Sequence, residues 1–297
     1  MPEDWEGARI IRASITDKDG LTAALVDSGP FDAAINCAGR ASDIGRDGEF
    51  RSVNYRGVLN LIECMSPAHI GRLVHISTTD VYGIRDFQDA NETTPFGNNL
   101  HNPYPKYKIL AEKAITGMLP PQKHVILRPG AVWGQGDTTI LPRVIGFLRQ
   151  SPYIVHFGKW RGRNRWPLAH VSNVALAVYL GASCDDTLGE AYNVVDTERT
   201  TTEEYYRMVI QKYLPQKSGM KSITLPLTAG WIYGALSSLL SNLFNLKGPL
   251  FDPSLYGLYS VSRNLDFSNR KLQDLFARHS GTSRGAPAPP AAVKNAI

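Results

Sequence analysis

The sequence predicts an α/β fold of the doubly wound kind, in which helices cover both faces of a parallel β-sheet. Strand-like apolar runs alternate with helix-like segments along the chain, and this alternation is typical of parallel strands joined by helical crossovers. The chain has 297 residues, of which 43% are hydrophobic and 20% charged. A chain of this size and composition can bury one sizeable core and carry a smaller appended lobe.

The strands are expected at residues 8–14, 33–36, 72–77 and 125–128, and the helices at residues 17–26, 54–65 and 104–118. The run at 31–39 is apolar and ends in small residues, whereas the run at 75–83 opens into hydroxyl-bearing ones. Ligands bind such sheets at the carboxyl ends of the strands. We expect Ala38, Gly39, Thr78 and Pro129 to lie there.

Tyr104 and Lys108 form the most informative pair of the chain. Four residues apart on a helix, they share one face and lie one turn from each other. A free phenol has a pKa of about 10, and a nearby ammonium draws that value toward neutrality, where a general acid/base works best. Pro105 suits the first turn of this helix. Thr78 could hold a substrate oxygen beside the phenol.

The chain contains a control for this pair. Tyr213 and Lys217 have the same spacing, but Pro215 stands between them and would break a shared helical turn. We therefore interpret the second pair as structural.

Several segments together resemble the extended short-chain dehydrogenase/reductase superfamily, which includes the NAD-dependent epimerases and dehydratases. They are residues 31–39, 54–63, 75–83, 104–108 and 124–134, and the resemblance runs from about Gly7 to Phe276. The carboxyl half is most similar to the 3β-hydroxysteroid dehydrogenase and sterol-4α-carboxylate 3-dehydrogenase group, through residues 104–113, 128–137, 167–175 and 265–272. Tyr107 departs from the small serine or threonine that this group commonly has before the lysine. The resemblance implies a Rossmann-like sheet.

The resemblance implies an NAD(P)-dependent oxidoreductase that interconverts a secondary alcohol and a ketone on a steroid-, terpenoid- or polyketide-like molecule. Tyr104 would transfer the proton, Lys108 would lower its pKa, Thr78 would bond the reacting oxygen and Asn54 would order a proton-relay water. The cofactor, NAD or NADP, is expected to contact Ser14, Ile15, Ala38, Gly39, Tyr104, Lys108, Pro129 and Val132. No metal is expected, and the resemblance is compatible with a homodimer.

The amino terminus departs from this family, which opens with a strand, a glycine-rich turn and a helix that holds the cofactor pyrophosphate. The sequence has no G-x-x-G-x-x-G after an early strand and begins just before what resembles the third strand. Roughly fifty to sixty residues of the usual opening are expected to be missing, through a misplaced start codon or through decay. Ser14 stands where a carboxylate is usual, while Ile15 still suits adenine. We therefore expect weak dinucleotide binding.

Residues 1–150 are expected to form the cofactor domain and residues 151–279 mainly the substrate lobe, with residues 167–196 returning to the core. Residues 280–297 are rich in proline and small residues, which predicts a disordered tail. Residues 223–246 contain no lysine, arginine, aspartate or glutamate. This apolar segment is interpreted as a lid over a hydrophobic substrate, an interfacial helix or a membrane span.

Charge and cysteine content narrow the choice of partners and compartment. The net charge of +5 and the pI near 9.0 permit weak attraction to anionic ligands or membrane surfaces, but no basic stripe or motif favours nucleic acid. Cys37, Cys64 and Cys184 are expected to be buried reduced thiols. With no signal peptide visible, the expected location is the cytoplasm, with membrane association left open.

Two other functions remain open from the sequence. Nucleotide-sugar epimerases and dehydratases of the same superfamily bind the substrate diphosphate with an arginine near Arg165, and bidentate phosphate recognition suits arginine. The alternative interpretation of residues 159–166 is a solvated basic loop. The chain could also be a catalytically silent remnant or a binding protein that kept the fold.

Overall fold

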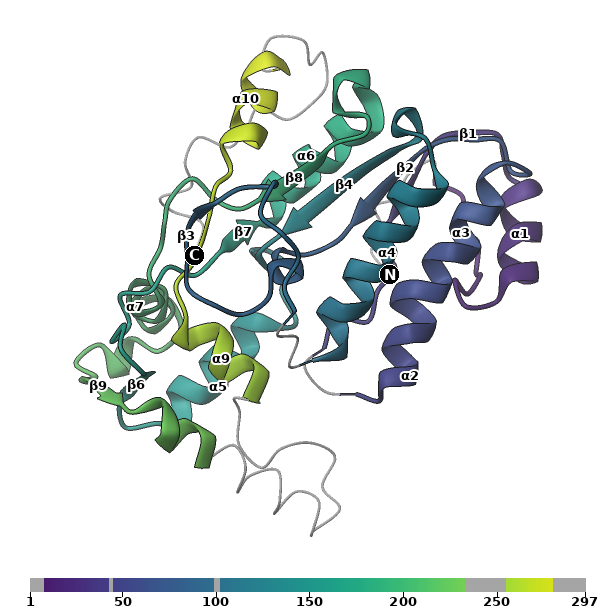
Figure 1. The fold of residues 1–297 in the computed structure, drawn as a ribbon. Helices are drawn as coiled ribbons and strands as arrows, with labels where there is room; N and C mark the ends of the chain where they lie inside the picture. The colour runs from purple at the N-terminus through teal and green to yellow at the C-terminus, as the bar shows by residue number, and fades with distance from the viewer. Residues whose placement is uncertain (1–7, 43–44, 99–101, 233–254, 280–297) are drawn as a thin grey trace.

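The computed structural model describes residues 8–42, 45–98, 102–232 and 255–279. At its centre is a four-stranded sheet in the order β1–β2–β4–β8 (Figure 1). The strands are β1 (Phe31–Asn36), β2 (Ile70–Ile76), β4 (His124–Pro129) and β8 (Ala191–Val194). All three pairings are parallel. The predicted fold class is therefore confirmed, and three of the predicted strands lie within two residues of their expected bounds.

Helices cover both faces of this sheet (Figure 1). One face is covered by α3 (Gly57–Met65) and α4 (Pro103–Met118), and the other by α6 (Val171–Ser183) and α10 (Arg270–His279). Adjacent residues of β2 point to opposite faces: Leu73 packs with the first pair of helices and Val74 with the second. Both side chains are fully buried. Such burial on two sides is what an internal parallel strand requires.

The strand predicted at residues 8–14 is wrong. These residues have no regular secondary structure and are exposed, Ile10 by 56% and Ile11 by 42%. Within the described residues β1 pairs only with β2, and Ile35 in β1 is 47% exposed. A strand needs a neighbour for its backbone donors and acceptors, and residues 8–14 have none. The helix that follows, α1 (Lys18–Val26), is capped by Asp17 and begins one residue after its predicted start.

The helix predicted at residues 54–65 begins earlier than expected. It starts with α2 (Asp47–Phe50), continues through the π-helix η1 (Arg51–Arg56) and runs on as α3. At its start the backbone N–H of Arg46 donates to Glu49 Oε2 at 3.2 Å. A carboxylate bonding back to the residue before the helix is a start signal, so Glu49 could have located this end.

Smaller pairs of strands surround the central sheet: β5 (Ala131–Trp133) with β7 (Leu168–His170), β6 (Ile154–Phe157) with β9 (Ser222–Leu225), and β3 (Phe87–Ala90) with β10 (Leu265–Phe267). Other α-helices of the described residues are α5 (Ile140–Gln150), α7 (Thr202–Tyr213) and α9 (Leu255–Ser262), and residues 227–232 are also helical. Short 3₁₀ helices are η2 (Thr79–Tyr82), η3 (Pro121–Lys123), η4 (Asp185–Thr187) and η5 (Pro215–Lys217). A second core joins α5, β6 and α7 through Leu148, Ile154 and Val209.

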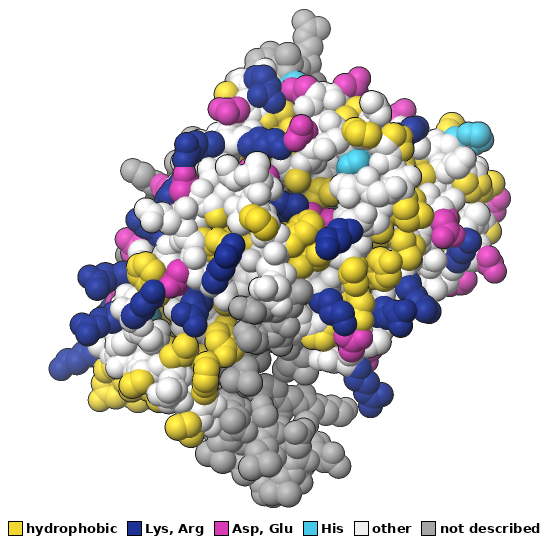
Figure 2. Space-filling model, in the orientation of Figure 1, with side chains coloured by type: hydrophobic (Ala, Val, Ile, Leu, Met, Phe, Trp, Pro, Cys, Tyr) yellow, Lys and Arg dark blue, Asp and Glu magenta, His cyan; other side chains and the backbone are white. Residues whose placement is uncertain are grey.

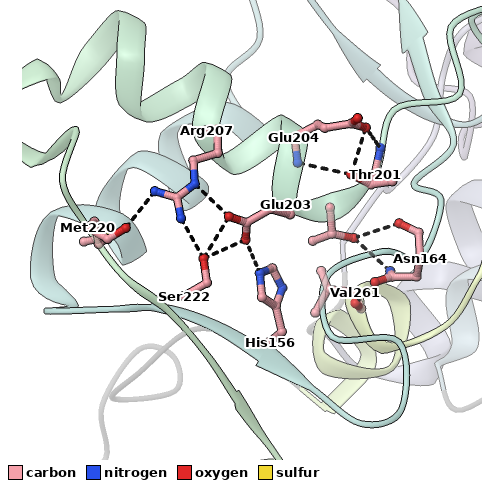
Figure 3. A network of polar contacts seen from close by, with 10 residues as sticks. His156, Asn164, Thr201, Glu203, Glu204, Arg207, Met220, Ser222 and Val261 are labelled. Atoms are coloured by element: carbon pink, nitrogen blue, oxygen red, sulfur yellow. Dashed lines mark hydrogen bonds and ion pairs between the residues drawn. The ribbon is translucent and has the colours of Figure 1, made fainter.

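A polar network holds the β6–β9 pair against α7 (Figure 3). Glu203 of α7 lies at its centre, with Oε2 2.5 Å from Nε2 of the buried His156 and Oε1 accepting from Arg207 Nε at 2.7 Å. Ser222 of β9 donates to the same carboxylate at 2.8 Å, and Arg207 donates to Met220 O at 2.7 Å. Hydrogen bonds and ion pairs thus connect α7 to both β6 and β9.

The apolar segment at residues 223–246 is not a single helix in its described part. Residues 223–225 belong to β9 and residues 227–232 are helical, whereas residues 233–246 lie outside the described residues, as does the predicted tail at 280–297. In the part of the chain that the structure describes, no helix is both long and apolar enough to cross a membrane.

The surface and the cysteines agree in part with expectation. On the face in Figure 2, lysine and arginine side chains are scattered among acidic and apolar ones.

Cys64 is buried and all three cysteines are free, but Cys37 is exposed and Cys184 is half-buried. The expectation of three buried thiols is therefore wrong. Cys37 follows β1, which pairs with β2 alone among the described strands.

Candidate active site

The helix carrying Tyr104 and Lys108 begins where its cap and proline place it. The Asn102 side chain accepts a hydrogen bond from the backbone N–H of Tyr104 at 2.7 Å, and Pro103 is the first residue of α4. Asparagine is a preferred cap, and proline suits the first turn because its missing N–H would have no helical partner there. The cap thus fixes where the first turn, with Tyr104, stands against the end of β2.

Tyr104 and Lys108 lie together as the spacing predicts. Lys108 Nζ is 5.9 Å from the centre of the Tyr104 ring. Lys108 is only 5% exposed, and its ammonium donates to the backbone carbonyl oxygen of Ile76, the last residue of β2, at 2.6 Å. The lysine therefore stands at the carboxyl end of a central strand.

The pKa of Tyr104 does not move in the expected direction. Burial raises the pKa of this phenol, the Asp80 carboxylate raises it further, and a hydrogen bond with the Thr78 side chain opposes both. Lys108 does not offset the rise, because its ammonium is directed to the Ile76 carbonyl. Burial also lowers the pKa of Lys108 to about 8, against the opposing effect of Glu112. Before a ligand enters, the phenol holds its proton firmly.

Thr78 occupies the expected place, and sequence reasoning missed two residues beside it. The buried Thr78 caps η2, with its side-chain oxygen accepting from the backbone N–H of Asp80 at 3.2 Å. The carboxylate of Asp80 in turn accepts from the Tyr256 hydroxyl at 2.5 Å. Asp80 follows Thr78 by two residues and could have been considered from the sequence. Tyr256 lies 176 positions farther along, and no sequence signal joins it to this site.

Asn54 reaches the site from the π-helix η1 and holds a loop. Its Oδ1 accepts from the backbone N–H of Arg40 at 2.7 Å, and its Nδ2 donates to the carbonyl of Arg40 at 3.1 Å. The side chain is 1% exposed. Both amide atoms therefore bind the segment that leaves β1. The sequence did not predict this contact of Asn54 with the backbone of Arg40.

The residues after β1 that were predicted to contact the cofactor lie at the carboxyl end of that strand. Ala38 and Gly39 are exposed at the carboxyl end of the strand. A Cβ on Gly39 would lie 3.4 Å from Lys108 Nζ and 3.5 Å from Asn54 Oδ1, so glycine keeps the space beside the lysine open. Pro129 ends β4 in the neighbouring part of the sheet, and Val132 lies half-buried in β5.

Of the two residues predicted to contact adenine, Ile15 lies against helix α3. Ser14 is exposed and bonds the Thr16 hydroxyl at 2.8 Å. Ile15 packs over Gly57, and its carbonyl accepts from Asn60 Nδ2 at 2.9 Å. No G-x-x-G-x-x-G turn precedes a helix in the described residues.

A buried ion pair supports the floor of the site. Arg128 of β4 donates to the carboxylate of Glu112 of α4 through Nε at 3.1 Å and Nη2 at 2.6 Å. Ser77, adjacent to Thr78, donates to the same carboxylate at 2.5 Å, and the Tyr82 hydroxyl accepts from Arg128 at 2.8 Å. This network joins the carboxyl end of β2 to the helix that carries Tyr104 and Lys108.

The unusual Tyr107 is accommodated away from the reacting groups. Its side chain is 4% exposed, and its hydroxyl donates to Asp47 of α2 at 2.5 Å.

The control pair, Tyr213 and Lys217, does not share a helical turn, as predicted. Helix α7 ends at Tyr213, and the Lys217 ammonium donates to the backbone carbonyls of Leu148, Arg149 and Ser151.

One cluster of metal-binding side-chain types occurs in the described ranges, outside this site. It comprises Cys184, Asp186 and His279. His279 Nδ1 lies 3.7 Å from the Cys184 sulfur, and Nε2 lies 3.1 Å from the Asp186 carboxylate. Asp186 also pairs with Arg278 at 3.2 Å, so a basic side chain shares its carboxylate.

Comparison with known families gives this geometry its context. The model of the NAD dependent epimerase/dehydratase family matches residues 2–194. The chain belongs to this family. The expected superfamily is therefore confirmed.

Among curated proteins, this chain is similar to a ketoreductase, a reductase and a dehydrogenase. The chain is 25% identical over 209 residues to the 4-hydroxy-2-methyl-3-oxo-4-farnesyl-3,4-dihydroquinoline-1-oxide ketoreductase of Stigmatella aurantiaca, covering 69% of this chain. It is 26% identical over 219 residues to the 2-alkyl-3-oxoalkanoate reductase of Stenotrophomonas maltophilia, again covering 69%. It is 28% identical over 218 residues, covering 68%, to the 3β-hydroxysteroid dehydrogenase/Δ5→4-isomerase of Mycobacterium tuberculosis.

The matched region spans 60%, 62% and 57% of the length of these three relatives. Among solved structures, the NAD⁺ complex of WbmH from Bordetella bronchiseptica has a TM-score of 0.63 at 20% identity, covering 75% of this chain and 72% of its own. DesIV from Streptomyces venezuelae, a dTDP-glucose 4,6-dehydratase, gives 0.57 at 21% identity, with 73% and 67% covered. These structures share the fold.

Proposed function

We propose that this protein is an NAD(P)-dependent oxidoreductase that interconverts a secondary alcohol and a ketone on a hydrophobic small molecule. One observation carries the proposal. Thr78, Tyr104 and Lys108, which come from two different elements, meet at the carboxyl end of β2. This is where doubly wound sheets bind their ligands.

Each side chain would have a distinct role in the reduction of a ketone. The Thr78 hydroxyl would donate to the carbonyl oxygen and orient it. The Tyr104 hydroxyl would give that oxygen its proton, and the raised pKa keeps this proton in place until the ketone arrives. The buried Lys108 ammonium would bind the ribose hydroxyls and counter the phenolate that forms. The nicotinamide cofactor supplies the hydride when it is bound.

The remaining residues would place the cofactor. Asn54 would hold the loop at Ala38 and Gly39 through the Arg40 backbone, and the nicotinamide would rest near residues 129–132. Ser14 and Ile15 would meet the adenine end. We propose that residues 151–279 supply most of the substrate contacts, with residues 167–196 packed in the core.

The preference for a hydrophobic substrate is supported by an apolar pocket of about 140 Å³ between α5, β6 and α9. It is lined by Val144, Phe147, Phe157, Trp166 and Val261, among others. A cavity of about 150 Å³ with similar walls can take up benzene, so this pocket suits a ring or a short branched alkyl group. The three relatives act, by their names, on a farnesylated quinoline, an alkylated oxoalkanoate and a steroid.

A nucleotide sugar is the alternative substrate, and Arg165 is the residue that would bind its diphosphate. In this structure the Arg165 guanidinium donates to the carbonyl oxygen of Arg199, and its backbone N–H donates to Asn264. The side chain therefore already has a partner within the fold, which supports the hydrophobic substrate.

The test compares turnover of steroid-like and polyketide-like ketones with turnover of UDP- and dTDP-sugars, using NADH and NADPH. We expect ketone reduction, and Tyr104→Phe should lower it roughly 10²–10⁴-fold while leaving the fold intact. Tyr213→Phe is the matched control and should stay near the parent rate. Equal losses in both variants would contradict the site. A preference for sugar nucleotides that Arg165→Ala abolishes would establish the alternative.

A further inference from the structure

A carboxylate lies beside the proposed reacting hydroxyls without an ion-pair partner. Asp80 Oδ2 accepts from the Tyr256 hydroxyl at 2.5 Å, and the backbone N–H of Asp80 donates to the Thr78 side chain. Within the described ranges no lysine, arginine or histidine pairs with Asp80. Burial raises the pKa of the Asp80 carboxyl above its ordinary value, whereas the hydrogen bonds with Tyr256 and Thr78 lower it. In its ionised form Asp80 raises the pKa of Tyr104.

The surroundings hold this carboxylate in place. Asp80 lies in η2, two residues after the Thr78 cap, so its backbone is fixed by the turn. Tyr256 lies in α9, which is anchored two residues later by the buried Leu258. A Cβ built on Gly230 would come within 2.7 Å of the Leu258 side chain, which shows how closely the two segments pack. The packing of α9 therefore holds Tyr256, and the turn at Thr78 holds Asp80.

We propose that Asp80 is a specificity-determining residue that restricts the site to substrates that are neutral around the reacting carbon. The inference rests on the proposed function. A substrate carboxylate one or two carbons from the ketone would be held a few ångströms from the Asp80 carboxylate. Like charges at about 5 Å in a partly buried site disfavour each other by roughly 10²-fold in binding. The Tyr256 phenol offsets little of this, because it is neutral and occupies one carboxylate oxygen.

The proposal separates two kinds of apolar ketone that the pocket alone would accept equally. An uncharged cyclic ketone meets only the hydroxyls and the apolar walls. A 3-oxo acid with the same alkyl chain also brings a carboxylate to within two carbons of the carbonyl. Because the two ketones are similarly hydrophobic, the charge next to the carbonyl decides which of them binds more tightly.

The experiment uses a matched pair of probes, a 2-alkyl-3-oxoalkanoate and its methyl ester, which differ in charge at one position. Both kcat/KM and the equilibrium Kd are measured, the latter by calorimetry on the protein without cofactor. We expect the parent protein to favour the ester by about 10²-fold. In Asp80→Asn, which keeps the size and can still accept from Tyr256, the preference should fall to within about threefold, mainly through better binding of the acid.

Asp86→Asn is the control, since Asp86 lies on the same segment but pairs with Lys159 and Trp160; it should leave the preference unchanged. Asp80→Ser provides a second variant should the amide disturb the turn, and thermal unfolding checks the fold of each. An ester-to-acid ratio in Kd that Asp80→Asn does not change would overturn the inference. If neither probe is reduced, the proposed function fails, while the ratio of Kd values still decides the role of Asp80.

Discussion

Lys108 Nζ donates to the backbone carbonyl oxygen of Ile76 at 2.6 Å, so the proposed catalytic lysine is held by the strand end that also presents Thr78. The ammonium is almost completely buried, with Glu112 one helical turn away. Burial of this charge costs free energy, and the hydrogen bond to Ile76 offsets only part of that cost. The site therefore contains a group whose charge state depends on pH near its working range.

The first prediction concerns this pH dependence of stability. Burial lowers the pKa of Lys108 from its ordinary 10.5 to about 8, so between these values the unfolded chain binds the proton more tightly than the folded one. The free energy of unfolding should then rise with pH across this window, by roughly 3 kcal/mol in total. Lys108→Met lacks this titration. The stability difference between parent and variant, measured by urea unfolding at several pH values from 7 to 10.5, should shift in favour of the parent by that amount. A stability difference between the parent and Lys108→Met that stays constant with pH would contradict the lowered pKa of Lys108.

The sequence could predict three strands of the central sheet, β1, β2 and β4, because local signals bound each of them, but it did not predict β8. The helix of Tyr104 could be placed for the same reason, since Asn102, Pro103 and Pro105 lie at its start. Residues 8–14 look like a strand by the same criteria, but a strand forms only where a neighbour pairs with its backbone. The segment's own sequence does not show whether such a neighbouring strand is present.

The candidate site was predictable where chemistry follows spacing, as for Tyr104 and Lys108. It was not predictable where distant segments meet. Tyr256 reaches Asp80 only because α9 packs beside β6. The direction of the Tyr104 pKa was also missed, since it depends on burial and on Asp80 rather than on the adjacent helical turn.

The second prediction concerns the buried ion pair. The side chains of Arg128 and Glu112 are 8% and 2% exposed. Glu112→Gln would leave the guanidinium without a counter-charge and should cost about 3–5 kcal/mol of unfolding free energy. Glu63→Gln is the control, because Glu63 pairs with Lys18 at the surface, where such pairs contribute little to stability. Urea unfolding followed by circular dichroism gives both values, and similar losses would show that the buried pair has no special role.

The third prediction separates two roles for Asn54. The structure has both of its amide atoms bound to the Arg40 backbone, so Asn54→Ala should loosen the loop that we propose contacts the cofactor. The KM for NADH or NADPH should then rise about tenfold or more, because a lost pair of buried hydrogen bonds costs about 1–3 kcal/mol. At saturating cofactor kcat should change little. A fall in kcat with an unchanged KM for the cofactor would instead favour the proton-relay role.

The fourth prediction concerns Gly130, which follows Pro129 in the loop proposed to lie under the nicotinamide. Here the chain approaches β7 so closely that a Cβ on Gly130 would lie 1.9 Å from the carbonyl oxygen of Pro167. That oxygen is not free to move, since it accepts from the backbone N–H of Ala131 at 2.7 Å. Gly130→Ala must therefore push β5 and β7 apart.

We expect this substitution to cost at least about 1–3 kcal/mol, the usual range for overpacking, because backbone rather than a flexible side chain must shift. Gly117→Ala is the matched control: Gly117 lies in α4 with nothing within 4 Å of the added Cβ. Alanine is favoured over glycine inside a helix, so that variant should be more stable by up to about 1 kcal/mol. Thermal and urea unfolding of the two variants should thus move in opposite directions. Because Gly130 lies in the loop at residues 129–132 that we propose to contact the nicotinamide, Gly130→Ala should also raise the KM for the cofactor. Gly117→Ala should leave that KM unchanged. If Gly130→Ala unfolds at the parent's urea concentration, the close approach of β5 and β7 is not as the structure has it.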